Sequence, residues 1–478
     1  MLSALFYTSL RVWHFSRVTV VANCICDPDM FDAVKSYVLV YGCPQAGINS
    51  QLVELLRRIA ALSSSRLLIN GRMTASFPIE RSVRQGDPIS MHLFVLYLHP
   101  LLVSLERVCD NDLIVAYADD ISVVVTSVRK IEQMLDLFRR FGRVLGAVLN
   151  LNKTTSINVG FVNENTIQVD WLRTEDSIKI LGVIFANSLR IMINLNWNTL
   201  IGKIAHQVRL HSLRSLTLHQ KVILLNTFVT SKVWYLSSIL PLYNMHSAKI
   251  TATMGILLWN RHPARVPMQQ LARPRKQGGL NLQLPALKCK ALLINRQLQE
   301  IGSTPYYASF ITQANPRLPP PNLPCLKTFL QTFPRLPPQI QLNPSSDQIH
   351  RLFIDQTAKP RVELRHPTVN WMRVWINIGS NKLTSAQRSN WYLLVNGKME
   401  HRVLWHTIGR VDNEQCLHCN AARETLKHKL SECPRVSAAW TLLQRKVAAT
   451  LNGSRRLIFD DLIQPILGEY TNVKYCLS

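Results

Sequence analysis

Two adjacent aspartates, Asp119 and Asp120, interrupt an apolar, β-branched run in the segment DLIVAYADDISVVV. Ionised carboxylates placed side by side repel each other and resist burial, and a divalent cation relieves both penalties. Hard oxygens of this kind suit Mg²⁺, which keeps water ligands and also binds substrate phosphates. An exposed Asp-Asp β-turn is the alternative interpretation, because Asp is common in turns. The pair is therefore a candidate catalytic metal site.

A second polar segment, RSVRQGDPIS at 81–90, lies upstream of the aspartates. Gly86 permits close approach of a ligand to the backbone, and Arg84 and Gln85 could contact phosphates and a base. Asp87-Pro88 is typical of a helix start, and the apolar run HLFVLYLHPLL follows it. The alternative is a capped helix after a polar loop without a binding role.

Metal-ligand spacing recurs near the end of the chain in Cys416-x2-Cys419-x8-His428-x4-Cys433. Three thiolates and one imidazole in tetrahedral geometry suit a structural zinc ion. His428 lies in ETLKHKLSEC, which we expect to form a short helix, while His418 between the cysteines should be exposed. Four ligands leave no open coordination position, so the role of the module would be structural or RNA-binding. A chance CxxC pair is the alternative.

Helical and strand-like patterns alternate between 36 and 190 and predict an α+β fold. VELLRRIAAL has helical spacing, whereas SRLLING and IKILGVIF are typical of short buried strands. The apolar runs 113–116 and 121–125 should pair as a hairpin that carries the two aspartates near its turn. Residues 1–35 have no clear period.

The chain is strongly basic, with 55 Lys+Arg against 29 Asp+Glu in 478 residues and a net charge of +26. Residues 195–300 are typical of helices, and 201–300 hold fourteen Lys/Arg but one acid, Glu300. Such a stretch favours a polyanionic partner, above all nucleic acid. Solvated helical surfaces are the alternative. Trp234, Tyr235 and Trp259 are interleaved and could stack on bases, although aromatics at helical spacing more often belong to a core.

Three further features bear on organisation and location. Residues 315–345 carry nine prolines and predict a linker. The ten cysteines of so long a chain do not indicate a disulfide scaffold and fit the cytosol or nucleus. No run reaches 18 uninterrupted apolar residues, so we expect no membrane partner. A secretory signal in the first 25 residues is disfavoured, because basic residues interrupt its apolar part.

The motifs RQGDPIS, LFVLYLHPLL and YADD, in this order, resemble the reverse transcriptases of non-LTR (LINE-type) retrotransposons. GRVLGAVLNLNKT at 142–154 looks like the family segment G-L-x-L-N-x-x-K-T, and LGVIF at 181–185 resembles the strand after it. LLINGRMTASFPIE at 67–80 resembles the stretch leading into RQGDP. The thumb of the family is resembled by HQKVILLNTFVTSKVWYLSSILPL, and the segment that follows the thumb is resembled by PRKQGGLNLQLPAL. The Cys/His module resembles the zinc-binding domain that follows many such enzymes.

The resemblance implies a right-hand polymerase palm, which is an antiparallel sheet with helices, a mainly helical thumb and a small zinc-binding module. The organisation expected from it is a degraded N-terminal segment, the palm, the thumb with a basic helical connection, a Pro-rich linker and a C-terminal region whose zinc module covers 400–440. These parts correspond in order to residues 1–35, 36–190, 191–300, 301–345 and 346–478.

The activity implied by the family is RNA-directed DNA polymerisation. Two Mg²⁺ ions would assist attack of a primer 3′-hydroxyl on a deoxynucleotide, with an RNA template and a DNA primer as partners. Asp119 would bind both metals, Asp120 would be the adjacent carboxylate, and Lys153 would neutralise or protonate the pyrophosphate. The residues carried over to the nucleotide and template pocket are Arg84, Gln85, Gly86, Tyr117 and Phe31, the last as the aromatic that excludes a ribose 2′-hydroxyl. An exposed loop lysine is the alternative for Lys153.

Departures from the family lie at the start of the chain. The family pattern at this point is D-x-x-K-A-F-D-x-V. When its F-D is aligned with Phe31-Asp32, Cys26 stands where the metal-binding Asp belongs. A soft thiolate suits Mg²⁺ poorly, which leaves Asp27, Asp29 and Asp32 as alternatives for the third ligand, with Asp27 preferred. The family's fingers region has no counterpart before this motif, so we expect a truncated or rearranged copy. An inactive nucleic-acid-binding remnant is therefore the rival hypothesis.

Overall fold

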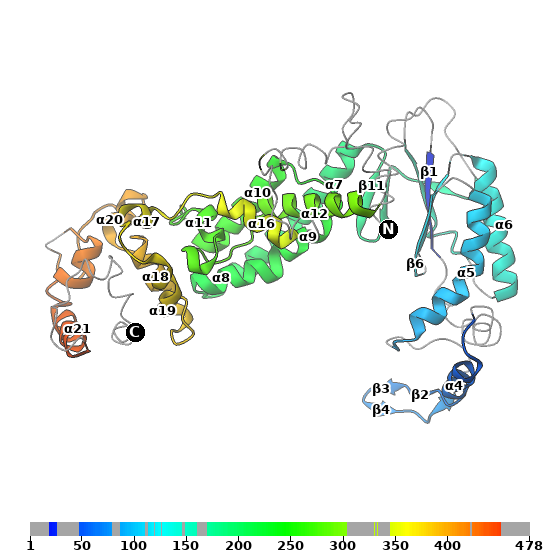
Figure 1. Ribbon diagram of the computed structural model, residues 1–478, viewed down its shortest axis with the longest axis horizontal. Helices are drawn as coiled ribbons and strands as arrows, with labels where there is room; N and C mark the ends of the chain where they lie inside the picture. Colours follow the sequence, from blue (N-terminus) through cyan, green and yellow to red (C-terminus); the bar gives the residue numbers. More distant parts are fainter. Residues whose placement is uncertain are drawn as a thin grey trace. The chain divides into compact units, whose positions relative to one another are not determined.

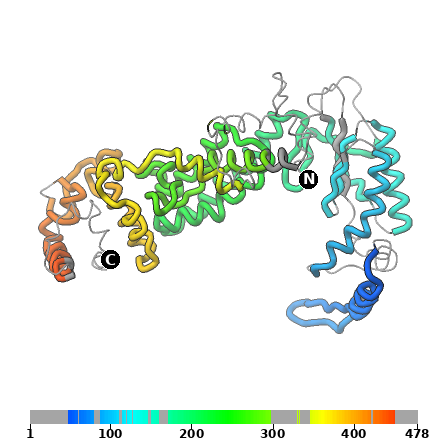
Figure 2. Tube along the Cα trace, viewed as in Figure 1, coloured from blue at the N-terminus to red at the C-terminus, as the bar shows by residue number. Residues whose placement is uncertain are grey.

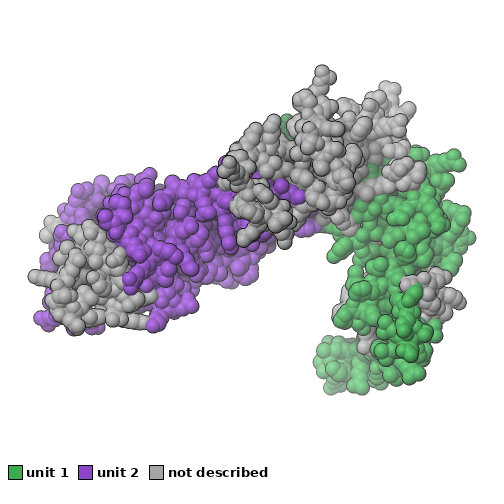
Figure 3. Space-filling model, viewed as in Figure 1, with its two compact units in different colours: residues 1–196 green, residues 197–478 purple. Residues whose placement is uncertain are grey.

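The computed structural model of the chain describes residues 19–25, 47–78, 87–109, 113–118, 120–125, 127–145, 149–159, 170–303, 329, 332, 345–420 and 423–450. The chain divides into two compact units, Met1–Asn196 and Trp197–Ser478, which Figure 3 colours separately. Figure 2 traces the path of the chain through both.

The first unit combines helices and strands (Figure 1). In chain order its elements are β1 (Thr19–Ile25), α4 (Ser50–Ala61), β2 (Ser64–Ser65), β3 (Leu68–Ile69), β4 (Arg72–Met73), β5 (Phe77–Pro78), α5 (Ser90–Cys109), β6 (Leu113–Tyr117), β7 (Asp120–Val125), α6 (Val128–Leu145), β8 (Thr155–Val159), β9 (Arg173–Thr174), β10 (Ser177–Ile180) and β11 (Val183–Ala186). Helix α7 (Leu189–Ser212) continues into the second unit. The predicted mixture of helices and sheets is confirmed.

One five-stranded sheet organises this unit, in the order β6-β7-β1-β8-β9. β1 pairs antiparallel with β7 on one side and with β8 on the other, β6 pairs antiparallel with β7, and the β8–β9 pair is parallel. The sequence pattern missed β1. Its segment TVVANCI lacks the strict apolar/polar alternation by which a half-exposed strand is recognised in a sequence.

Helices α5 and α6 lie along one side of this sheet (Figure 1). Alternate residues of β7, namely Ile121, Val123 and Val125, share a core with the buried faces of both helices. The α6 members Ile131, Met134, Leu135 and Phe138 follow helical spacing. Tyr97 of α5 donates a hydrogen bond of 2.8 Å to the carbonyl oxygen of Leu145, which fixes α5 against the end of α6. The core thus gives the sheet a rigid backing.

Helix α5 has the length and apolar composition of a membrane span. Its largest buried residues, Phe94, Tyr97, Leu98, Leu101 and Leu105, all belong to the core of the first unit. The protein interior therefore accounts for one face of the helix, whereas Met91 and Val95 on the rest of it are exposed.

The segment that follows α4 differs from its prediction. VELLRRIAAL does form most of α4, but SRLLING is not a buried strand. Among the described strands β3 pairs with β4 alone, and Leu68 and Ile69 are 67% and 56% exposed. Asn70 and Gly71 both have positive φ, 52° and 78°, so the segment turns back on itself as a tight hairpin. This hairpin lies outside the five-stranded sheet, which explains its exposure.

The second unit is mainly helical, as predicted for 195–300. After α7 its elements are α8 (Leu218–Leu224), the π-helical turn η2 (Leu225–Val229), α9 (Ser231–Ser237), α10 (Asn244–Trp259), α11 (Met268–Ala272), the short 3₁₀ turn η3 (Arg275–Gln277), α12 (Pro285–Ser303), α16 (Ser346–Asp355), α17 (Arg361–Arg365), α18 (Trp371–Ile378), α19 (Ser385–Val395), α20 (Arg402–Thr407), the π-helical turn η4 (His428–Glu432) and α21 (Ser437–Thr450).

Helices from before and after the Pro-rich stretch pack together in this unit. α8 and α19 both begin with a capping box, and their caps and first turns meet: Thr217 Oγ1 lies 2.7 Å from Ser385 Oγ, and His219 Nδ1 lies 2.9 Å from Ser389 Oγ. Within residues 315–345, only 329, 332 and 345 are among those the structure describes.

Candidate active site and metal centre

The acidic turn joins β6 to β7, as the sequence predicted. Their antiparallel register places Tyr117 opposite Asp120 and Ala116 opposite Ile121. Ala118, in the turn itself, has a φ of 50°, a left-handed conformation that short connections of this kind require. Asp120 is half-buried at the first position of β7, whereas Tyr117 is 61% exposed. Asp119 lies outside the described residues.

A third strand reaches the same edge, because Ile25, the last residue of β1, lies opposite Asp120. The segment that follows Ile25 holds Cys26 and the third-ligand alternatives Asp27, Asp29 and Asp32. These positions lie outside the described residues, as does Phe31.

Lys153 is brought to this edge by β8. Thr155 at the start of β8 lies opposite Asn23 near the end of β1, so the starts of β7 and β8 and the end of β1 coincide. The lysine is exposed in a turn where its backbone N–H donates to the side-chain and main-chain oxygens of Asn150, both at 3.1 Å. The sheet therefore brings Asp120 and Lys153, separated in sequence, to one edge.

The polar segment before α5 is described only from Asp87 onward, so Arg84, Gln85 and Gly86 lie outside the described residues. The Asp87 carboxylate accepts a hydrogen bond of 3.0 Å from the N–H of Ile89, and its carbonyl accepts one of 3.1 Å from Ser90. Asp87 thus caps the start of α5, which begins at Ser90 rather than at Pro88.

The four Cys/His residues form one cluster in the second unit. The ligand atoms of Cys416, Cys419, His428 and Cys433 all lie within 4.8 Å of one another. Cys416 Sγ and Cys433 Sγ are 3.9 Å apart, and Cys419 Sγ is 3.4 Å from His428 Nε2. Two sulfurs bound to one tetrahedral zinc are roughly 3.8 Å apart, whereas a disulfide would hold them near 2.05 Å. The geometry and donor types fit a metal ion.

Local structure explains why the cluster closes. Gln415 and Arg423 form an antiparallel bridge, and Asn420 between them has a φ of 55°, so the CxxC segment folds into a knuckle. Glu414 pairs with Arg423, whose guanidinium lowers the pKa of that carboxyl. His428 opens η4, and the N–H of Cys433 donates back to its carbonyl at 2.9 Å. His418 is exposed.

The basic stretch 201–300 carries less surface charge than its composition suggests. Lys221, Arg273 and Lys288 are buried, with exposures of 7%, 7% and 9%. Lys221 donates to Asn260 Oδ1 at 2.7 Å, and burial lowers the pKa of its amine. Lys288 pairs with Asp347. These cations hold the fold together, which charge counting could not foresee.

The interleaved aromatics of this stretch divide between core and surface. Trp259 is buried at 5% exposure, Trp234 is half-buried, and Tyr235 is 51% exposed. Only Tyr235 therefore presents most of its ring to solvent.

Comparison with known proteins agrees with the motifs. Residues 29–185 match the family described as reverse transcriptase (RNA-dependent DNA polymerase). The "uncharacterized 149 kDa protein" of transposon TX1 from Xenopus laevis is 25% identical over 291 residues, 56% of this chain and 22% of that protein. The chain thus spans about a fifth of the relative's length. A telomerase structure from Candida albicans, in complex with a TWJ fragment of telomeric RNA, aligns with a TM-score of 0.31 and 14% identity, covering 65% of this chain and 53% of that one.

Residues 29–185 therefore form a reverse transcriptase domain. The predicted relationship to the reverse transcriptases of non-LTR retrotransposons is confirmed. Members of this family use Mg²⁺ and bind an RNA template together with a nucleic-acid primer.

Proposed function

We propose that the chain acts as the RNA-directed DNA polymerase of a non-LTR retrotransposon, with the first unit containing the palm and the helices of 191–300 forming the thumb. The observation that carries the proposal is the meeting of β1, β7 and β8 at one sheet edge, with Asp120 at the start of β7 and Lys153 before β8. Carboxylates at this edge, backed by a rigid core, are the arrangement that metal-assisted phosphoryl transfer needs.

The reaction is attack of a primer 3′-hydroxyl oxygen on the α-phosphorus of a deoxynucleotide, while the bond from that phosphorus to the pyrophosphate oxygen breaks and the hydroxyl proton passes to water. Bound Mg²⁺ supplies neutralisation of the phosphate charge and a lowered hydroxyl pKa. Asp119 and Asp120 would hold the metal ions, with Asp27 as the third carboxylate.

The remaining residues would bind and orient substrates. Lys153, an exposed ammonium on a short turn, would neutralise or protonate the departing pyrophosphate. Arg84, Gln85 and Gly86 would line the nucleotide and template pocket. Tyr117, exposed opposite Asp120, would contact the same substrates. Phe31 would exclude a ribose 2′-hydroxyl.

A closed Cys₃His cluster is proposed to hold one structural zinc ion. The 3.9 Å separation of the two buried sulfurs supports this assignment. The ion would stabilise the region 400–440 and would take no part in the chemistry.

A primed RNA template with deoxynucleotides and Mg²⁺ tests the polymerase proposal. The native chain should extend the primer and Asp119→Ala should not. No extension by the native chain, or equal extension by both proteins, would defeat it.

The second candidate function is a non-catalytic nucleic-acid-binding remnant. Cys26, which follows Ile25 at the end of β1, favours it, because a thiol replaces the carboxylate that the family places there. This function predicts salt-sensitive RNA binding that Asp119→Ala leaves unchanged, together with no primer extension.

A further inference from the structure

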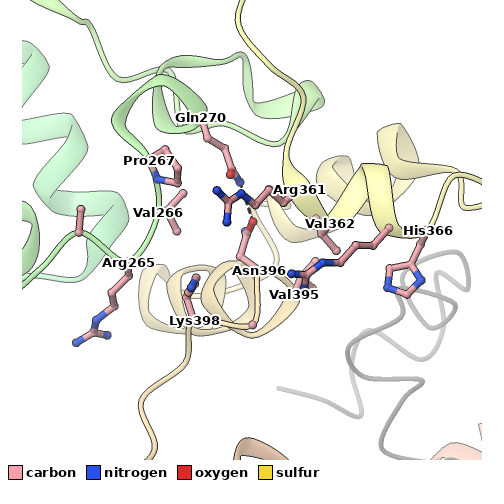
Figure 4. A pocket seen from close by; sticks show the side chains of 13 residues that line it. Arg265, Val266, Pro267, Gln270, Arg361, Val362, His366, Val395, Asn396 and Lys398 are labelled. Atoms are coloured by element: carbon pink, nitrogen blue, oxygen red, sulfur yellow. Dashed lines mark hydrogen bonds between the residues drawn. The ribbon is translucent and has the colours of Figure 1, made fainter. Parts of the chain in front are cut away.

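A cavity of about 400 Å³ in the second unit is lined by the segment that leads into α11, by α17 and by the residues that end α19 (Figure 4). Several basic side chains line it, and no carboxylate is present among the described lining residues. Its basic residues are Arg265, Arg361, Arg365, His366 and Lys398. In Figure 4 the Arg361 side chain lies beside Gln270, whereas Arg265 points away from them.

Three of these cations have no ion-pair partner among the residues that the structure describes. Arg265 pairs with Glu400, but no described carboxylate pairs with Arg361, Arg365 or Lys398. The acid nearest in sequence to Arg361 and Arg365, Glu363 on the same short helix, accepts a hydrogen bond of 2.7 Å from Trp375 Nε1. The acid nearest in sequence to Lys398 is Glu400, which pairs with Arg265. Like charges gathered around one cavity repel, and a bound anion relieves that repulsion.

The cavity is also held in shape before any ligand arrives. Gln270 Nε2 donates to Asn396 Oδ1 at 2.7 Å across its floor. Arg273 anchors the segment before α17 through a hydrogen bond of 2.7 Å to the carbonyl of Thr357. A preformed cavity spares the ligand much of the entropy cost of ordering its site.

The wall between these polar groups is apolar. Val266, Val362 and Val395 supply it, and each is buried. Cations at the rim and aliphatic groups below them match a phosphate that is followed by a sugar or base.

We propose that this cavity binds a phosphate group of a nucleic-acid strand, with Arg361, Arg365 and Lys398 as its ligands. The inference rests on the proposed function, since it names a place in the second unit where the template or primer strand binds. A free nucleotide or inorganic phosphate offers the same chemistry, so the test must separate these sources from a strand.

Fluorescence anisotropy of a labelled single-stranded RNA of about twenty nucleotides, measured with the full chain at several salt concentrations, provides the test. In the double variant Arg361→Gln/Arg365→Gln, affinity should fall roughly tenfold, and the slope of log K against log salt should fall by about 1.4 for two lost contacts. The matched control Arg351→Gln/Arg373→Gln removes the same charge from exposed positions outside the cavity and should keep the slope.

The outcomes are distinct. Equal losses in the pocket and control variants would overturn the inference, because overall charge would then explain them. Displacement of the RNA by a mononucleotide or inorganic phosphate at micromolar concentration would also overturn it, in favour of a small anion. Circular dichroism confirms that each variant is folded. Native protein that fails to bind RNA at all would defeat the proposed function as well, whereas RNA binding that the pocket variant retains would defeat this inference alone.

Discussion

Ile25 lies directly opposite Asp120 in the antiparallel pairing of β1 with β7. Asp120 has Tyr117 as its partner on the other side, so three strands meet at the acidic turn. A carboxylate at such a junction is positioned by two ladders of backbone hydrogen bonds. The geometry of the edge is therefore set by the sheet rather than by a loop.

Replacement of Asp120 tests the proposed metal site at this edge of the sheet directly. Asp120→Asn keeps the size of the side chain but removes the charge that would hold Mg²⁺, and primer extension should slow by roughly 100-fold or more, because the metal contributes several kcal/mol of charge stabilisation. Asp176→Asn, at an exposed position of the same unit, is the control and should retain the native rate. Equal rates for both variants would show that Asp120 has no part in the reaction.

The Cys/His cluster predicts a measurable metal content. Purified native protein should carry about one zinc equivalent, and Cys416→Ser should lower both that content and the Tm, because three ligands close the site poorly. His418→Ala is the matched control, since His418 is exposed between the two cysteines. Native zinc content in Cys416→Ser would contradict the assignment.

Buried histidines predict an acid-sensitive second unit. Desolvation by burial, with smaller effects from Arg388 and Arg275, lowers the pKa of His219 from 6.5 to about 4. Between about pH 4 and pH 6.5 the unfolded chain therefore binds more protons than the folded chain. The free energy of unfolding should fall as pH drops through this range. The loss from this one group is on the order of 3 kcal/mol.

Urea unfolding at pH 7 and pH 4 measures most of this loss. His219→Phe keeps a ring beside Tyr392 and should reduce the pH dependence, to which buried His350 still contributes, while His206→Gln, at an exposed site on α7, should leave it unchanged. Unchanged pH dependence in His219→Phe would refute the prediction.

Two glycines with left-handed backbones should respond very differently to alanine. A Cβ at Gly278, φ +79°, would lie 2.7 Å from Pro360 Cγ and 2.9 Å from Trp375, whereas at Gly409, φ +70°, it meets nothing within 4 Å. Gly409→Ala should cost about 1 kcal/mol from backbone strain. Gly278→Ala adds overpacking, for a total of about 3 kcal/mol. Equal midpoints of chemical denaturation would refute this difference.

Much of the first unit could be predicted because its signals are local. The β6–β7 hairpin, α4 and α5 follow from apolar runs and cap residues within a few positions of each other. The Cys/His cluster follows from spacing alone, since a CxxC knuckle and a nearby His and Cys can reach one another over short chain lengths.

Other features depend on distant partners and could not be predicted. β1 owes its place to strands far along the chain, and SRLLING is exposed because its partner among the described strands is the other half of its own hairpin. Lys221 and Lys288 look like surface charges until Asn260 and Asp347 are brought to them by the fold. The cations around the cavity come from three separate segments, so no sequence window contains them together.

The position of β1 has a consequence for how this protein is made. The ribosome releases β1 long before it has synthesised β7 and β8, the two strands between which β1 must insert. Until then its backbone N–H and C=O groups lack their partners, and an unpaired strand edge readily joins another chain. Nascent chains that stop before β8 should therefore be the most prone to associate with one another.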